Sequence, residues 1–110
     1  MQISIRRVDK ATIIDVSGDI DLSNSPEVRK VLLHEVGDHR KPRVVLNLSG
    51  VGYMDSSGVA SLVESLKASR DIGSRFILVG LSGPAREVLQ LSRLMKVFEI
   101  YETEVEALAA

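Results

Sequence analysis

The residues best suited to chemistry stand together in the segment Asp55-Ser56-Ser57-Gly58. This segment lies between a short apolar run, residues 43–48, and a stretch whose apolar residues recur with helical spacing. It is therefore predicted to open a helix, and the first amides of a helix have no internal partners and carry partial positive charge. A phosphate on a first-turn serine would sit against those amides, which contributes roughly 0.3–1 kcal/mol at an exposed site. The pattern suits a serine that a kinase modifies.

The same four residues also make an ordinary helix N-cap. Either Asp55 or Ser56 could accept a hydrogen bond from an amide two or three residues further on. Because serine-rich helix starts are common, the residue types alone favour this structural interpretation. Gly58 is expected to limit side-chain crowding beside the serine hydroxyl.

Other catalytic and ligand-binding chemistries find little support in the sequence. There is no cysteine, so disulfides, thiolate catalysis and cysteine metal sites are excluded. His34 and His39 lie on or just after a predicted helix, where lone histidines are usually solvated. The sequence has no Gly-x-Ser-x-Gly elbow and no glycine-rich phosphate loop. We therefore expect no catalytic residue, metal or cofactor, although a serine nucleophile at position 56 or 57 is the enzymatic alternative.

Composition indicates one folded domain spanning residues 1–110. Forty-five per cent of the residues are hydrophobic, which argues against disorder. The 14 basic and 15 acidic residues are spread along the chain, and the net charge of -1 provides no footprint for nucleic acid. The first seven residues lack the apolar core of a signal peptide, and the apolar runs are too short to span a bilayer. These features predict a soluble cytoplasmic protein with no membrane insertion.

The pattern of apolar residues and turn residues predicts strands and helices in the order β-β-α-β-α-β-α-β-α. Single helices between strands imply parallel pairing, and the opening hairpin adds an antiparallel pair. The expected fold is α/β, a mixed sheet with about four helices packed on it. The strands are expected at 2–8, 11–17, 43–48, 75–79 and 97–101, and the helices from Ser25, from Ser56 or Ser57, at about 84–91 and at about 102–108.

Several side chains receive specific expectations from this pattern. Val88 and Leu91 are expected to point inward from their helix, and Met54 and Tyr53 to pack under the loop before Ser56. Asn47 stands on an otherwise apolar strand, where a satisfied amide is the favoured interpretation.

The sequence also resembles a known family. The segment Tyr53-Met54-Asp55-Ser56-Ser57-Gly58-Val59, preceded by Val45-Leu46-Asn47-Leu48, resembles the signature of the STAS domain in anti-sigma factor antagonists. Three further stretches resemble the loop after the family's second strand, its helix-to-strand junction, and its third helix with the last strand: Gly18–Leu22, Ile72–Phe76 and Pro84–Phe98. The resemblance runs from about residue 2 to residue 108.

The resemblance implies a role for each residue of the segment. The family's phosphorylated serine corresponds to Ser56, and Ser57 would serve capping or packing one position into the helix. Asp21 and Asp55 match the family's acids beside the site, which could orient the hydroxyl or the cation of the kinase. A solvated loop residue is the structural alternative for Asp21.

The resemblance also implies partners. Antagonists of this kind bind an anti-sigma factor that is a serine kinase with a GHKL-type ATP site, and a metal-dependent serine phosphatase resets the modified serine. ATP and metal would then belong to those proteins. The docking surface is expected to include the loop Gly18–Ser25, the loop 49–56 and the exposed face of the helix from Ser57. The alternative within the family is a regulatory subunit of another assembly, namely a lipid-transport ABC system, a stressosome or a secretion regulator.

Overall fold

A computed structural model describes residues 1–37 and 41–110 of the chain. The predicted order of strands and helices is confirmed. The strands are β1 (Gln2–Val8), β2 (Ala11–Ser17), β3 (Arg43–Gly50), β4 (Arg75–Val79) and β5 (Glu99–Tyr101), and the helices are α1 (Ser25–Gly37), α2 (Ser56–Asp71), α3 (Gly83–Leu91) and α4 (Glu104–Ala109).

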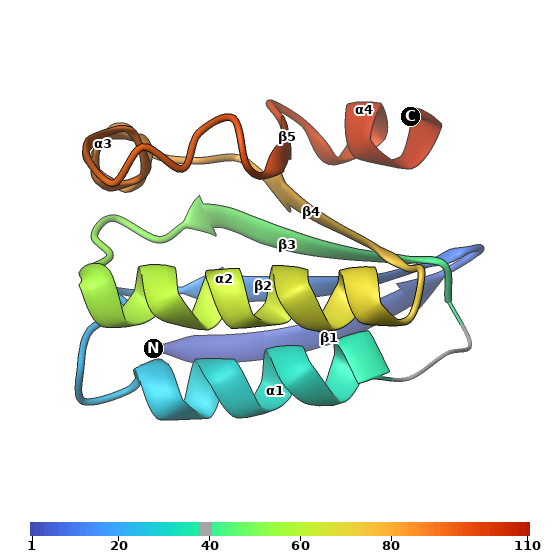
Figure 1. Cartoon of the computed structure of the whole chain (residues 1–110), viewed down its shortest axis with the longest axis horizontal. Coiled ribbons are helices and arrows are strands. Elements are labelled where there is room, and N and C mark those ends of the chain that lie inside the picture. The colour runs from blue at the N-terminus through green and yellow to red at the C-terminus, as the bar shows by residue number, and fades with distance from the viewer. Residues whose placement is uncertain (38–40) are drawn as a thin grey trace.

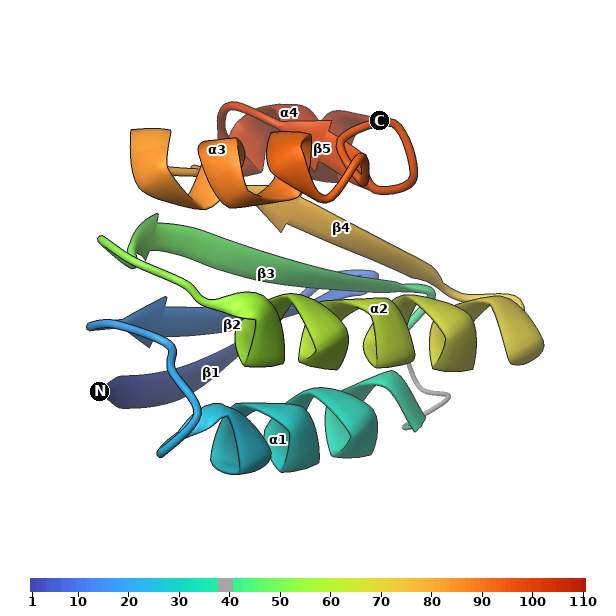
Figure 2. The same cartoon turned by 60° about the vertical axis from the view of Figure 1, so that its left-hand side comes forward.

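The strands form one mixed sheet in the order β1-β2-β3-β4-β5. β1 is antiparallel to β2, and the remaining neighbours are parallel, which confirms the predicted fold class. Connections between parallel strands are almost always right-handed. Because each new strand is added on the same side of the previous one, the connecting helices lie on one face of the sheet. α1 and α2 accordingly lie side by side across the same face (Figure 1), and a view turned by 60° shows the same arrangement (Figure 2). Ala85 and Leu89 of α3 belong to the same apolar core as α1 and α2.

The inward face of α3 differs from the prediction. Ala85 and Leu89 are buried, Val88 is half-buried and Leu91 is 77% exposed, so the expectation that Leu91 points inward is wrong. The helix carries two apolar pairs, Ala85 with Leu89 and Val88 with Leu91, and the pair with the small Ala85 side chain is the one buried in the core. Leu91 is left on the solvent side.

The last strand and helix are shorter than predicted. β5 begins at Glu99 rather than Val97, because the Val97 amide donates to the Leu94 carbonyl (3.0 Å) in a preceding turn. α4 begins at Glu104 because Thr103 caps it: the Thr103 hydroxyl accepts from the Glu106 amide (3.2 Å), and the Glu106 carboxylate accepts from the Thr103 amide (3.2 Å). This reciprocal pair satisfies two amides that a helix start leaves free.

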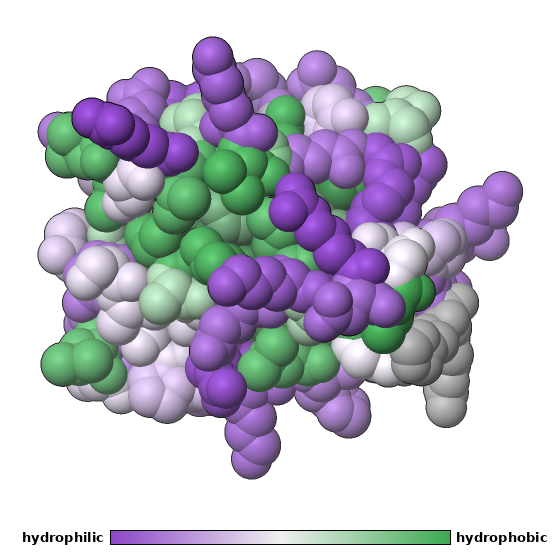
Figure 3. Space-filling view, in the orientation of Figure 1, coloured by the Kyte–Doolittle hydropathy of each residue, from purple (hydrophilic) through white to green (hydrophobic). Residues whose placement is uncertain are grey.

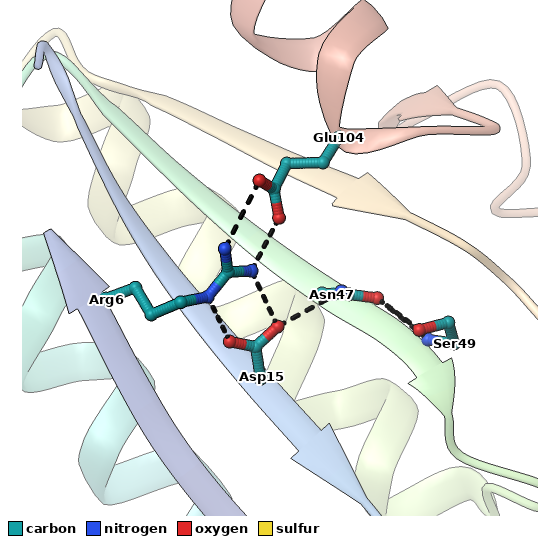
Figure 4. A network of polar contacts seen from close by, with 5 residues as sticks. All are labelled: Arg6, Asp15, Asn47, Ser49 and Glu104. Atoms are coloured by element: carbon teal, nitrogen blue, oxygen red, sulfur yellow. Dashed lines mark hydrogen bonds and ion pairs between the residues drawn. The ribbon is translucent and has the colours of Figure 1, made fainter. Parts of the chain in front are cut away.

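A polar network ties α4 to the face of the sheet opposite α1 and α2 (Figure 4). The Arg6 guanidinium donates to the carboxylates of Asp15 (2.7 Å) and Glu104 (2.5 Å), and it lowers the pKa of Asp15. The Asn47 amide donates to Asp15 (3.1 Å) and accepts from the Ser49 amide (3.0 Å). The favoured interpretation of Asn47 as a satisfied amide is confirmed.

α2 packs on α1 and carries three buried serines, Ser61, Ser65 and Ser69. Their hydroxyls donate to carbonyls of α2 itself, at 2.7–3.1 Å, so each of these three buried hydroxyls has a partner. The Ser61 hydroxyl lies 3.5 Å from the carbonyl of Ser25, the first residue of α1. The small side chains thus bring the starts of the two helices together. No helix in the described ranges is long and apolar enough to cross a membrane.

Candidate functional site

The candidate site lies at the carboxyl edge of the parallel strands. The loops that follow β2 and β3 leave the sheet at this edge and enter α1 and α2, at the left of Figure 1. Carboxyl ends of neighbouring parallel strands meet at one edge, which is where α/β sheets usually carry their sites. Ser56 is the first residue of α2.

Backbone hydrogen bonds join the loop after β2 to the loop after β3. Ile20 and Met54 form a parallel bridge, in which the Ile20 amide donates to the Tyr53 carbonyl (2.9 Å) and the Asp55 amide donates to the Ile20 carbonyl (3.1 Å). The side chains of Ile20 and Met54 are both buried, which confirms the prediction for Met54. The site therefore sits on a backbone that is fixed from both sides.

Asp55 is the N-cap of α2, so the structural interpretation of this residue is confirmed. Its Oδ1 accepts from the Ser57 amide (2.9 Å), the Ser57 hydroxyl (2.5 Å) and the Gly58 amide (3.3 Å). Its Oδ2 accepts from the Leu22 amide (3.1 Å), which belongs to the other loop. Hydrogen bonds from the Ser57 hydroxyl and from the amides of Gly58, Ser57 and Leu22 lower the pKa of Asp55. One carboxylate thus joins the helix start to the loop before α1.

Acid is expected to weaken the fold partly through Asp55. The folded state holds its pKa below that of an unfolded aspartate, about 3.9. The carboxylate therefore contributes its full stabilisation above that value, and the contribution is lost as the pH falls through the folded pKa. Asparagine still caps the helix but has no charge to lose. In urea unfolding, the free energy of Asp55→Asn should fall less than that of the wild type below about pH 4.

The matched control for this measurement is Asp9→Asn, in the exposed turn between β1 and β2. We expect its acid dependence to follow that of the wild type. Identical acid dependence in Asp55→Asn and in the wild type would contradict the role assigned to the carboxylate.

The two serines differ in what their hydroxyls do. Ser57 is half-buried and bound to Asp55, as expected for a capping role. Ser56 is exposed, and its hydroxyl forms no hydrogen bond with any residue that the structure describes. Of the pair, Ser56 is the serine that another protein can reach.

The expectation that a phosphate on Ser56 would rest on free helix amides is wrong for two of those amides. The amides of Ser57 and Gly58 already donate to Asp55. A phosphate on Ser56 would therefore stand beside a carboxylate that is held in place by four hydrogen bonds. The electrostatics at this point oppose added negative charge.

Gly58 faces the interior rather than the surface. A Cβ atom at this position would lie 2.5 Å from Cγ of Met54 and 2.9 Å from Cγ2 of Ile20. The interpretation that Gly58 keeps the space beside the Ser56 hydroxyl open is therefore wrong. Because Gly58 has no side chain, α2 can instead lie close to the bridge between Ile20 and Met54.

Asp21 lies on the loop that Asp55 holds. It is half-buried, and its Oδ1 accepts from the Ser23 amide (3.0 Å) and the Ser23 hydroxyl (2.5 Å). Among the described residues no hydrogen bond joins Asp21 to Ser56. The structure thus brings the loops of Asp21 and Ser56 together but gives Asp21 a local role within its own turn.

Tyr53 and the histidines occupy the surface. Tyr53 is 52% exposed, so the expectation that it packs inward is wrong. In an extended segment neighbouring side chains point to opposite sides, and Met54 takes the inward position. The His34 side chain is 80% exposed, and His39 lies outside the described residues. No group of three or more His, Asp or Glu residues in the described ranges is placed to hold a metal ion.

Comparison with known proteins gives consistent matches along the chain. The family model of the STAS domain matches residues 2–107. An anti-sigma F factor antagonist of Paenibacillus polymyxa is 28% identical over 108 residues, covering 98% of this chain and 92% of the relative. An anti-sigma-B factor antagonist of Staphylococcus aureus (strain NCTC 8325 / PS 47) is 30% identical over 99 residues, covering 89% and 91%. The crystal structure of an anti-sigma factor antagonist from Mycobacterium paratuberculosis superposes with a TM-score of 0.89 at 26% identity, covering 98% of this chain and 91% of that one.

Proposed function

This chain belongs to the STAS domain family, and we propose that it is an anti-sigma factor antagonist controlled by phosphorylation of Ser56. Anti-sigma factor antagonists of this family are non-enzymatic regulatory proteins. In this proposal residues 1–110 act as one STAS domain in the cytoplasm, where sigma factors act. The protein works by occupying an anti-sigma factor and thereby freeing a sigma factor.

The observation that carries the proposal is the state of the Ser56 hydroxyl. It is exposed and unbonded within the described structure, while the neighbouring hydroxyl of Ser57 is committed to Asp55. The partner is a serine kinase with a GHKL-type ATP site, which binds the unmodified protein and then phosphorylates it. A metal-dependent serine phosphatase restores the hydroxyl.

In this proposal the partner is released because of the charge and the size of the phosphoryl group at the carboxyl edge of the sheet. Phosphorylation adds about -1.5 to -2 charges at neutral pH. The new charge stands next to Asp55, whose carboxylate is held at one oxygen by the first turn of α2 and at the other by the loop before α1. The phosphate therefore changes the surface that the partner contacts without any refolding. Asp21, on the loop held by Asp55, adds to the negative charge at this edge.

Affinity capture from the source cells, with and without ATP, tests this proposal. We expect the wild-type protein to retain a GHKL-type kinase and to lose it when ATP is added, while its own mass rises by one phosphoryl group on Ser56. Retention of transporter, stressosome or secretion subunits, with no phosphoryl group gained, would instead assign the protein to another assembly that uses a STAS domain.

A further inference from the structure

Two apolar side chains that the sequence pattern places inside, Tyr53 and Leu91, lie on the surface and line one groove. The groove has a volume of about 410 Å³. One wall is the loop that ends at Ser56, and the other wall is α3. Ser56 itself is a lining residue. We call this feature the α3 groove, lined by Tyr53, Met54, Asp55, Ser56, Pro84, Glu87, Val88 and Leu91.

The α3 wall is one complete face of the helix. Pro84, Glu87, Val88 and Leu91 follow one another at i, i+3, i+4 and i+7. A surface helix normally has one apolar stripe, which it buries against the core. α3 buries Ala85 and Leu89, while on the groove side Val88 is half-buried and Leu91 is exposed to solvent.

The apolar surface extends beyond the groove along the junction of α2 and α3. Figure 3 shows hydrophobic side chains gathered between these two helices. Val63, Leu94 and Met95 pack only partly into the core, and Val97 is 38% exposed. Contiguous exposed apolar surface of this kind is typical of sites where a protein or another ligand binds.

We propose that the α3 groove receives an apolar side chain of the anti-sigma factor kinase. This inference rests on the proposed function and defines part of the partner surface. Because Ser56 lines the groove, a kinase that reaches its hydroxyl must cover the groove as well. Most of the lining is apolar, which suits an apolar side chain, and the two charged lining residues, Asp55 and Glu87, are acidic and would repel a carboxylate of the partner.

The groove also gives the phosphate a second way to act. A phosphoryl group on Ser56 would stand at the edge of an apolar contact, where covering it would strip water from a double negative charge. Burial of an unpaired charge is strongly unfavourable. The kinase segment therefore leaves the groove once the serine is modified.

The test compares two aliphatic side chains that are almost equally exposed to solvent. Leu91 is 77% exposed in the groove, and Val105 is 76% exposed on α4, which packs on the opposite face of the sheet. The dissociation constant is measured by titration calorimetry against the purified kinase that the wild type retains in the capture experiment, without ATP. Leu91→Asp should weaken binding about tenfold or more, as expected for an apolar anchor. Val105→Asp should bind within about twofold of the wild type.

A second pair of variants, both to alanine, tests the groove without introducing a charge that could impair folding. Tyr53→Ala should weaken binding several-fold, while Val105→Ala should leave it unchanged, and circular dichroism should show that all variants fold. Equal affinity of Leu91→Asp and Val105→Asp for a kinase that the wild type does bind would overturn the groove while leaving the proposed function intact. If the wild type binds no anti-sigma kinase at all, the proposed function fails, and this inference fails with it.

Discussion

Ser56→Ala is expected to remain bound to its kinase when ATP is present, whereas the wild type is released. The variant loses the only hydroxyl of the Ser56–Ser57 pair that is free in the structure, so it cannot accept a phosphoryl group. In a surface-binding assay, adding ATP should weaken the wild-type complex by about tenfold or more, a change of roughly 1.4 kcal/mol. The same addition should leave the Ser56→Ala complex unchanged, and its intact mass should not increase.

Ser57→Ala is the matched control for this experiment. The Ser57 hydroxyl donates to Asp55, so its loss should cost roughly 0.5–1.5 kcal/mol of folding stability. We expect Ser57→Ala to be phosphorylated and released like the wild type. Phosphoryl transfer to Ser56→Ala but not to Ser57→Ala would move the modified residue to position 57.

Gly58→Ala is expected to lower the free energy of unfolding by about 1–3 kcal/mol, the range for overpacking a filled interior. The added methyl would lie 2.5 Å from Cγ of Met54 and 2.9 Å from Cγ2 of Ile20, and both of these side chains are buried. Either α2 or the two loops joined at the Ile20–Met54 bridge must shift. We therefore expect the affinity for the kinase to fall together with the free energy of unfolding. Urea unfolding of the variant and of the wild type measures the first effect.

Gly83→Ala provides the control, because Gly83 is also in the first turn of a helix. A Cβ atom there would meet no atom within 4 Å. Its stability should stay within about 0.5 kcal/mol of the wild type. If Gly58→Ala is as stable as Gly83→Ala, the close packing of α2 on the Ile20–Met54 bridge is not as tight as the structure indicates.

Local signals in the sequence were sufficient for most of the fold. The apolar runs and the residues that interrupt them predict the order of strands and helices. Gly73, for example, follows the C-cap of α2, Ile72, and adopts a φ of +74°, a conformation that favours glycine and that ends helices. The α3 stripe was the exception. Periodicity finds an apolar face, but it does not rank two apolar faces against each other when one depends on a small residue such as Ala85.

Residue types alone single out the candidate site, but they do not predict which contacts hold it together. The Asp55-Ser56-Ser57-Gly58 segment predicts a capped helix start, and Asp55 provides that cap. The second use of Asp55, its bond to the Leu22 amide, joins residues 33 positions apart. No local pattern predicts such a contact, because it depends on how two strands of the sheet are paired. The exposure of Tyr53 likewise follows from the Ile20–Met54 bridge.

The strand order also determines the shape of the surface at the carboxyl edge of the sheet. Nucleotide-binding α/β sheets hold their ligand in a crevice where the strand order reverses and adjacent loops part to opposite faces. In the described part of this chain the order runs from β1 to β5 without reversal, so the loops after β2 and β3 turn the same way and lie against each other. Under the proposed function, a partner therefore contacts one continuous edge made by both loops, together with the α3 groove beside it, and does not enter a crevice between the loops. Under the proposed function, substitutions along this edge would change which partner binds while the sheet beneath stays the same.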